Sequence, residues 1–177
     1  MDYGLEAAVE AENRFSAQGR LYRHYEVTPE LIWHYSPRYD FSLGYEESGT
    51  YHHEDLEQGH QGYLTTTLKL DVKEWRFGSR QRLQAGTDNG ATVWIFRQKN
   101  RVAYAGVFLP FDLVPFLADE WFCDLQGGGI TENRVQLGLS RALNEKSKIE
   151  LYGMWVDQWM PHHSSTPVFG LNFTLNF

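Results

Sequence analysis

The chain has 177 residues and a net charge of −7, with a mean hydropathy of −0.49. This length fits one domain, residues 1–177, and the single cysteine, Cys123, excludes an intramolecular disulfide and a multi-cysteine metal site. The acidic balance argues against a nucleic-acid partner, because such proteins neutralise phosphates with Lys and Arg.

The chain is rich in aromatic residues, which make up 15% of it, although it is hydrophilic on average. No run approaches the roughly 20 consecutive apolar residues that a membrane-spanning helix requires. The first residues, Met1 to Gly4, lack the basic and apolar regions of a signal peptide. If the protein is exported, we expect its precursor to carry the export signal.

Alternation of apolar and polar residues predicts ten strands. In chain order they are residues 3–15, 20–35, 39–50, 61–73, 75–87, 91–108, 117–126, 130–143, 147–160 and 167–177. An even number places both ends of the chain on one side and allows the sheet to close. Closure removes the unpaired edges that lipid cannot accommodate.

The predicted connections differ between the two ends of the sheet. We expect tight turns at 36–39, around Glu74 and at 143–147. At the opposite end we expect a longer polar loop over 50–60, together with loops at 87–90, 126–129 and 161–165. Short turns at one end and longer loops at the other are typical of outer-membrane barrels.

The segment 109–116 is the exception, because it is an apolar connection on the short-turn side. Pro110 and Pro115 argue against a regular strand there, since proline cannot donate to the ladder of a sheet. We expect this segment to lie along the membrane interface.

The last predicted strand has the strongest pattern. Large apolar residues occupy one side, and small or polar residues such as Asn172 and Thr174 occupy the other. The apolar side consists of Phe169, Leu171, Phe173, Leu175 and Phe177. This is typical of the closing strand of a bacterial outer-membrane β-barrel. We expect Leu171, Phe173, Leu175 and Phe177 to engage the outer-membrane assembly machinery.

The charged residues decide which face of the sheet meets membrane lipid. The polar side of strands 75–87 and 91–108 carries Arg76, Arg80, Arg82, Arg97, Lys99 and Arg101. Each would cost about 2–4 kcal/mol on the lipid face near the midplane. All of them together would exceed the roughly 5–15 kcal/mol stability of a domain. The charged side must therefore face a lumen. Strand 91–108 fits this pattern least well, because Gln98 and Asn100 fall on its outward face.

The residues that we predict to line the lumen are the inward-facing charges of six strands. They are Glu10, Glu12, Glu26, Arg80, Arg82, Arg97, Lys99, Arg101, Glu120, Glu132 and Arg134. Further acidic residues of the first three strands, Glu6, Glu30 and Glu46, share this face.

Aromatic residues near the strand ends predict two interfacial girdles. At the short-turn end these are Trp33, Tyr35, Tyr104 and Phe108, and at the other end Trp94, Trp155 and Trp159.

The sequence also resembles an uncharacterised family of small Gram-negative outer-membrane β-barrels, a domain of unknown function. The similar stretches are 12–15, 21–25, 43–45, Trp75 with 79–83, 118–122, 132–139 and the C-terminal strand. The resemblance covers about residues 12–177 and implies a transmembrane antiparallel up-and-down β-barrel in the bacterial outer membrane. It implies no established activity, substrate or catalytic residues.

Two interpretations of the inward charges remain open. They form either a network of ion pairs that holds the barrel shut, or a narrow pore for small solutes or ions. Barrels of about eight strands are filled by side chains, whereas those of about 16–18 leave a channel. Ten strands lie near the filled end, so we favour an occluded lumen.

Two other functions are conceivable. His52, His53, His60, His162 and His163 fall in predicted loops, where His162, His163 and Asp157 would form the rim site of an outer-membrane enzyme. Their spacing matches no metal motif, so we predict no metal, no cofactor and no enzymatic activity. The third possibility is a soluble lipocalin-like barrel with its apolar face inward. The pattern does not indicate an oligomeric state.

Overall fold

The structure, a computed structural model, describes residues 4–16, 22–52, 55–88, 91–106, 110–159 and 163–177. Within these ranges the chain forms ten strands and one short 3-10 turn, η1 (Pro110–Asp112). The strands are β1 (Leu5–Ser16), β2 (Tyr22–His34), β3 (Tyr39–His52), β4 (Asp55–Val72), β5 (Trp75–Asp88), β6 (Ala91–Tyr104), β7 (Val114–Asp124), β8 (Gly129–Ala142), β9 (Ser147–Gln158) and β10 (Ser164–Asn176). No helix of these segments is long and apolar enough to cross a membrane.

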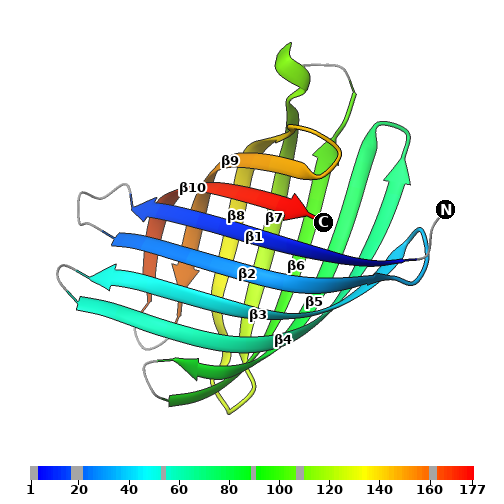
Figure 1. Ribbon diagram of the computed structural model, residues 1–177. Helices are drawn as coiled ribbons and strands as arrows, with labels where there is room; N and C mark the ends of the chain where they lie inside the picture. The colour runs from blue at the N-terminus through cyan, green and yellow to red at the C-terminus, as the bar shows by residue number, and fades with distance from the viewer. Residues whose placement is uncertain (1–3, 17–21, 53–54, 89–90, 107–109, 160–162) are drawn as a thin grey trace.

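The strands form one closed antiparallel barrel (Figure 1). Each strand pairs with its neighbours in sequence, and β10 pairs with β1 from Ala8 opposite Asn176 to Ser16 opposite Val168. The sheet therefore has no free edge. The predicted ten-stranded up-and-down barrel is confirmed, and strand bounds differ from the predicted ones mostly by one to three residues. Parts of the predicted strands, such as residues 3, 20–21, 107–108 and 160, lie outside the described residues.

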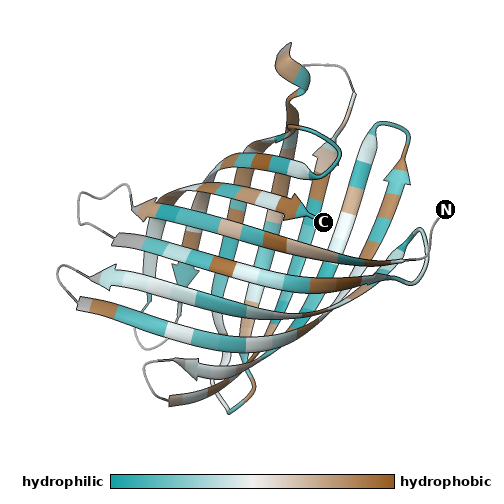
Figure 2. Cartoon of the chain, in the orientation of Figure 1, coloured by the Kyte–Doolittle hydropathy of each residue, from teal (hydrophilic) through white to brown (hydrophobic). Residues whose placement is uncertain are grey.

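Apolar side chains face outward and charged ones face inward. On β10, Phe169 is 59% exposed and Phe173 is 38% exposed, whereas Asn172 on the other face is 7% exposed. The colours of Figure 2 alternate along the strands accordingly. This arrangement is that of a membrane barrel, and it is the reverse of what a soluble lipocalin-like barrel requires.

Aromatic side chains gather near both ends of the barrel. At the end where the chain termini lie, here called the terminal end, the Trp33 and Tyr35 ring centroids are 5.5 Å apart. The rings of Trp75 and Tyr104 are 4.9 Å apart at the same end. At the far end, Trp121 contacts Trp159 at 6.3 Å. Such belts fit the two membrane–water interfaces. Phe108 lies outside the described residues.

The predicted long loop over 50–60 is wrong. β3 continues to His52 and β4 begins at Asp55, with Thr50 opposite Glu57 and His52 opposite Asp55. Extended backbones pair here despite the polar side chains, because these strand ends need no apolar face once they leave the hydrocarbon. The longest interval between strands is 105–113, at the terminal end. The expected contrast between short turns and long loops is therefore absent.

The structure also corrects the expectation that no regular strand forms over 109–116, because β7 begins at Val114. Pro115 lies within β7, opposite Leu139 of β8, although the sequence analysis excluded a strand there. Pairing between β6 and β7 begins only at Ala103 opposite Phe116, so at Pro115 no backbone N–H is needed to bond with β6. Pro29 in β2 follows the same rule, because the pairing of β2 with β3 omits residues 28 and 29.

Tyrosine rings cover glycines on neighbouring strands inside the barrel. A Cβ added to Gly170 would lie 2.1 Å from Cζ of Tyr152, and one added to Gly44 would lie 2.2 Å from Cζ of Tyr63. These glycines let the rings lie flat against the sheet, so that bulky side chains fit within a narrow barrel.

Replacement of Gly170 by Ala should destabilise the barrel by about 1–3 kcal/mol, because Tyr152 must leave its place. Gly78→Ala is the matched control, since nothing lies within 4 Å of its added Cβ. Urea-induced unfolding in lipid vesicles, followed by tryptophan fluorescence, measures both. Equal unfolding midpoints for the two variants would contradict the packing described here.

Candidate functional site: the charged lumen

The centre of the lumen holds a compact group of ionised side chains. Glu46 of β3 accepts hydrogen bonds through Oε2 from Arg82 Nη1 at 3.2 Å, Gln84 Nε2 at 3.1 Å and Arg97 Nη1 at 3.1 Å. Arg97 also donates to Glu120 Oε1 from Nε at 3.2 Å and from Nη2 at 3.0 Å. Bifurcated contacts of this kind fix the planar guanidinium between two carboxylates.

Two further cations approach Glu120. Arg80 Nη2 lies 3.8 Å from its Oε1, and Lys99 Nζ lies 3.7 Å from its Oε2. We call the following residues the central cluster: Glu46, Arg80, Arg82, Gln84, Arg97, Lys99 and Glu120. Four of these side chains are cationic and two are anionic, so the cluster carries a formal surplus of positive charge.

Some of these contacts cross the lumen. Strands β3 and β6 are three positions apart in the barrel, yet Glu46 and Arg97 are in contact. Strands β6 and β9 are also three apart, and Arg101 Nη2 lies 2.7 Å from Glu150 Oε1. Side chains from strands that are not neighbours thus meet inside the lumen.

A second group lies on β1 and β2. Arg14 donates to Glu12, its neighbour on the same face, and to Glu26 at 3.0 Å. All three side chains are buried. Charges taken from water in this way are tolerated only when paired and hydrogen-bonded.

Aromatic rings flank the buried guanidinium groups. The Arg82 guanidinium lies 3.8 Å from the Tyr63 ring centroid, and that of Arg101 lies 3.7 Å from the Phe116 centroid. Both Arg97 and Arg134 approach the Phe122 ring, at 4.6 and 4.2 Å. Cation–π contacts stabilise these cations and fill space beside the ion pairs.

Little free space remains at this level. A cavity beside the charged members Arg80, Arg82, Arg97, Lys99 and Glu120 of the central cluster has a volume of about 20 Å³. A cavity needs roughly 10–15 Å³ to hold one water molecule. This cavity therefore has room for about one water molecule.

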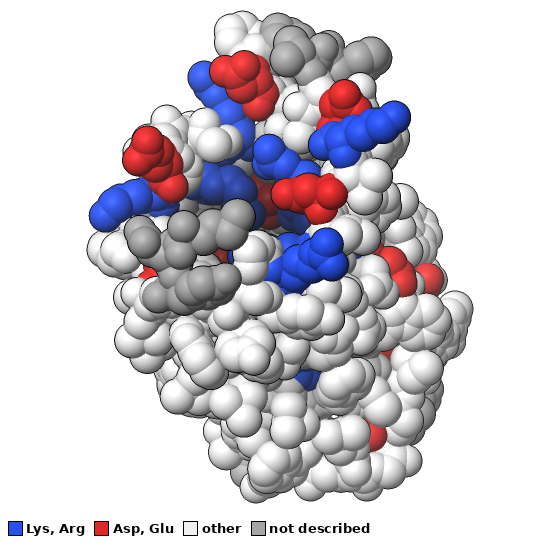
Figure 3. Space-filling view, turned by 90° about the vertical axis from the view of Figure 1, so that its right-hand side faces the viewer, with Lys and Arg blue, Asp and Glu red and all other residues white. Residues whose placement is uncertain are grey.

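The lumen widens toward the terminal end into a vestibule. One cavity of about 410 Å³ lies against Arg80, Lys99 and Glu150, and another of about 600 Å³ continues it to the rim. They share Lys69 and Arg101 in their walls. Figure 3 shows this end of the molecule, where charged side chains surround a hollow in its upper half.

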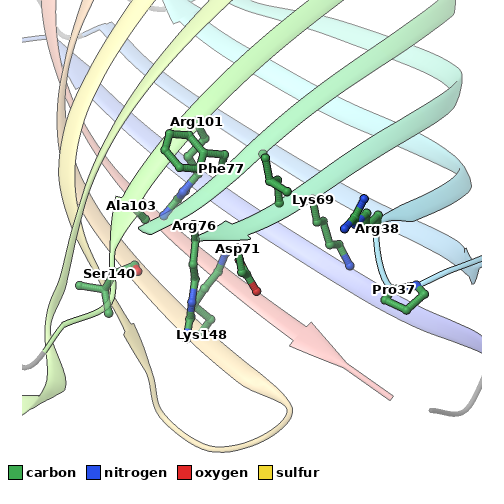
Figure 4. A pocket seen from close by; sticks show the side chains of 13 residues that line it. Pro37, Arg38, Lys69, Asp71, Arg76, Phe77, Arg101, Ala103, Ser140 and Lys148 are labelled. Atoms are coloured by element: carbon green, nitrogen blue, oxygen red, sulfur yellow. The ribbon is translucent and has the colours of Figure 1, made fainter. Parts of the chain in front are cut away.

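The rim of the vestibule is mainly basic. Its cations come from β4, β5, β6, β9 and the β2–β3 turn, and they surround the cavity in Figure 4. They are Arg38, Lys69, Arg76, Arg101 and Lys148. Asp71 is the acidic residue among the lining side chains. Such a ring attracts anions from solution, with a strength that falls as salt rises.

The structure places the other predicted lumen residues as follows. Glu10 accepts a hydrogen bond of 2.5 Å from Asn172 of β10. Glu132 pairs with Arg134 on β8 and accepts from Gln158 at 2.8 Å. The sequence analysis did not single out Gln84, which is 1% exposed and links Glu46 to Arg97. Its position in the same alternating register as Arg80 and Arg82 was the available signal.

The histidines do not form one rim site in the described residues. His60 faces outward on β4, where its Nδ1 lies 2.7 Å from the Tyr45 hydroxyl. Asp157 accepts a hydrogen bond from Ser165, and His163 is exposed. His53 and His162 lie outside the described residues, as does the side chain of His52. No group of three or more His, Cys, Asp or Glu in the described part could hold a metal ion.

Loss of one charge from the central cluster should weaken the fold. Glu120→Gln removes the negative charge that faces Arg97, Arg80 and Lys99. Breaking a buried ion pair costs about 3–5 kcal/mol. Urea-induced unfolding in lipid vesicles measures the loss. Glu74→Gln, in an exposed turn, is the control and should leave the midpoint unchanged. An unchanged midpoint for Glu120→Gln would show that its carboxylate is solvated.

Solved structures with the same fold are outer-membrane proteins. The beta domain of the Bordetella autotransporter BrkA superposes with a TM-score of 0.54 at 11% identity, covering 98% of this chain and 99% of that one. The COG4313 outer membrane channel from Pseudomonas putida F1 gives 0.53 at 10% identity, with 100% and 97% covered. The KdgM porin, solved with disordered oligogalacturonate, gives 0.51 at 10% identity, with 97% and 99% covered. At such identities the likeness shows the fold alone.

No curated protein matches the sequence. Residues 1–166 match the family described as "Protein of unknown function (DUF2490)".

Proposed function

The chain belongs to the DUF2490 family, and we propose that it is an integral protein of the bacterial outer membrane whose lumen is closed by ion pairs. Its apolar outer face and aromatic girdles support insertion in a bilayer. The fold that it shares with outer-membrane channels and porins supports this location. In that membrane, the terminal end would face the periplasm.

The central cluster carries the proposal of a closed lumen. Glu46, Arg97 and Glu120 join β3, β6 and β7 by contacts of 3.0–3.2 Å, and the cavity beside Arg97 and Glu120 measures about 20 Å³. A cavity of this size holds about one water molecule, since roughly 10–15 Å³ is sufficient for one. A hydrated ion or a sugar needs far more room, so passage would require the cluster to part.

The basic rim of the vestibule predicts the selectivity of any opened state. Acidic and basic side chains are equal in number around the central cavity, whereas the rim carries an excess of cations. Fixed charges of one sign around a narrow pore admit the opposite ion. A barrel opened at this point would thus prefer anions.

The partners that we propose are membrane lipid on the outer face and the assembly machinery at β10. Leu171, Phe173 and Phe177 are exposed, whereas Leu175 is half-buried. Leu171, Phe173 and Leu175 lie on β10, which closes the barrel against β1, and Phe177 directly follows that strand.

The protein should be silent in planar lipid bilayers, because no continuous water path crosses the central cluster. Arg97→Ala combined with Glu120→Ala removes one cation and one anion and should produce steady conductance. Under a salt gradient, the reversal potential should show preference for anions.

Lys69→Ala combined with Asp40→Ala is the matched control. This ion pair lines the wide vestibule, so its loss removes equal charge without opening the centre. It should leave the barrel silent. Large, stable conductance of the unmodified protein would contradict the proposal.

A further inference from the structure

A row of polar side chains crosses the outward face of four neighbouring strands, where membrane lipid is expected. We call it the outer polar band. It consists of Ser79 and Gln81 on β5, Gln98 and Asn100 on β6, Asp119 on β7 and Asn133 on β8. Two of these residues, Gln98 and Asn100, are those that broke the outward pattern of the sequence.

The band is continuous because strand pairing aligns its members. Ser79 lies opposite Asn100, and Gln81 lies opposite Gln98. Asn100 in turn lies opposite Asp119. Polar residues on separate strands thus fall in two adjacent rows rather than being scattered.

The band lies at mid-depth of the barrel wall. On β6, the outward residues Phe96 and Val102 flank it, followed by Trp94 toward one end and Tyr104 toward the other. On this strand the flanking residues are apolar or aromatic, so Gln98 and Asn100 are not at the water interface. Asp119 and Asn133 lie closer to the far end, beside Trp121. In hydrocarbon, polar groups and carboxylates are disfavoured unless they find partners.

The members of the band hydrogen-bond one another. Gln98 Nε2 donates to Ser79 Oγ at 2.9 Å and to Asn100 Oδ1 at 3.1 Å. Asp119 accepts from Asn133 at 2.7 Å and also from the Trp121 indole. Within the described residues, no hydrogen bond reaches Gln98 Oε1 or Asn100 Nδ2. An acceptor and a donor are therefore left facing outward.

An apolar groove of about 380 Å³ borders the band. Its walls include Leu68, Phe77, Val102 and Leu117, and Asn100 lies at its edge. A groove beside unsatisfied polar groups gives a partner both a shape and a set of hydrogen bonds to match.

We propose that the outer polar band and this groove form the interface between two copies of the chain. Copies inserted in one membrane share the same orientation, so a two-fold axis must run along the membrane normal. Each residue then meets residues of its own depth on the other copy. Gln98 and Asn100 are hydrogen-bonded to each other and together present an amide acceptor and an amide donor, so this part of the band is complementary to itself under that symmetry.

Such amide contacts between copies are the means by which polar side chains associate in a membrane. This interface does not depend on whether the lumen conducts, because the band lies on the opposite face of the wall from the central cluster.

Cysteine crosslinking in outer membranes of an expressing bacterial host tests the interface. Ser79→Cys, Gln98→Cys and Asn100→Cys, each combined with Cys123→Ser, are treated with a bismaleimide. Dimers of the 20.6 kDa chain should form from at least Asn100→Cys. Leu171→Cys in the same background is the control, because β10 lies four strands from β6 and its exposed leucine faces lipid. It should stay monomeric.

The double substitution Gln98→Leu and Asn100→Leu is a second test of the interface. This variant should keep the heat-dependent gel mobility of a folded barrel, while its mass in nanodiscs falls from two chains to one. Equal crosslinking at positions 100 and 171, or a single-chain mass for the unmodified protein, would overturn the proposal. Crosslinks only to a different host protein would also overturn it, and would assign the band to another partner.

Discussion

The inability of lipid to solvate charge is the constraint on which the rest of this structure depends. It requires the sheet to close and requires the ionised register of each strand to point away from the bilayer. Arg82, Arg97 and Glu120 are consequently confined within a tube. Because ten strands enclose little space, these side chains cannot remain separately hydrated, and they pair with one another instead.

Pairing across the lumen distinguishes this barrel from one with charges arranged along a wall. Arg97 connects Glu46 of β3 with Glu120 of β7, so one guanidinium links strands on separate sides. The ion pairs at this level thereby connect separate strands of the barrel. On the terminal side of this level the barrel widens, and its cations line open space at the rim. The molecule is thus asymmetric along its axis, with a basic rim at the terminal end and ion pairs at the centre.

Alternation in the sequence was sufficient to predict the number of strands, their orientation and the confinement of the arginines, because a strand has only two faces. It failed where pairing partners decide the outcome. Residues 55–60 extend β4 because β3 offers them a partner, and Pro115 joins β7 because its missing N–H falls where β6 does not pair. Which inward charges meet across the lumen depends on curvature and register, so Arg97 could be placed inward but not assigned to Glu46.

The outward exceptions were informative in the same way. Gln98 and Asn100 stood out in one strand, but only the register of β5, β6 and β7 shows that they continue into Ser79 and Asp119. The polar residues of one strand could be interpreted only together with those of the paired strands, and the sequence alone does not show which residues are paired.

A double-mutant cycle between Glu46 and Arg97, measured by unfolding in lipid vesicles, tests closure of the lumen most directly. The pair joins strands that are not neighbours, so its coupling exists only if the side chains meet across the centre. We expect Glu46→Gln and Arg97→Met to be strongly non-additive, with a coupling energy of about 1–3 kcal/mol. Additive effects of the two substitutions would contradict a lumen closed by this contact.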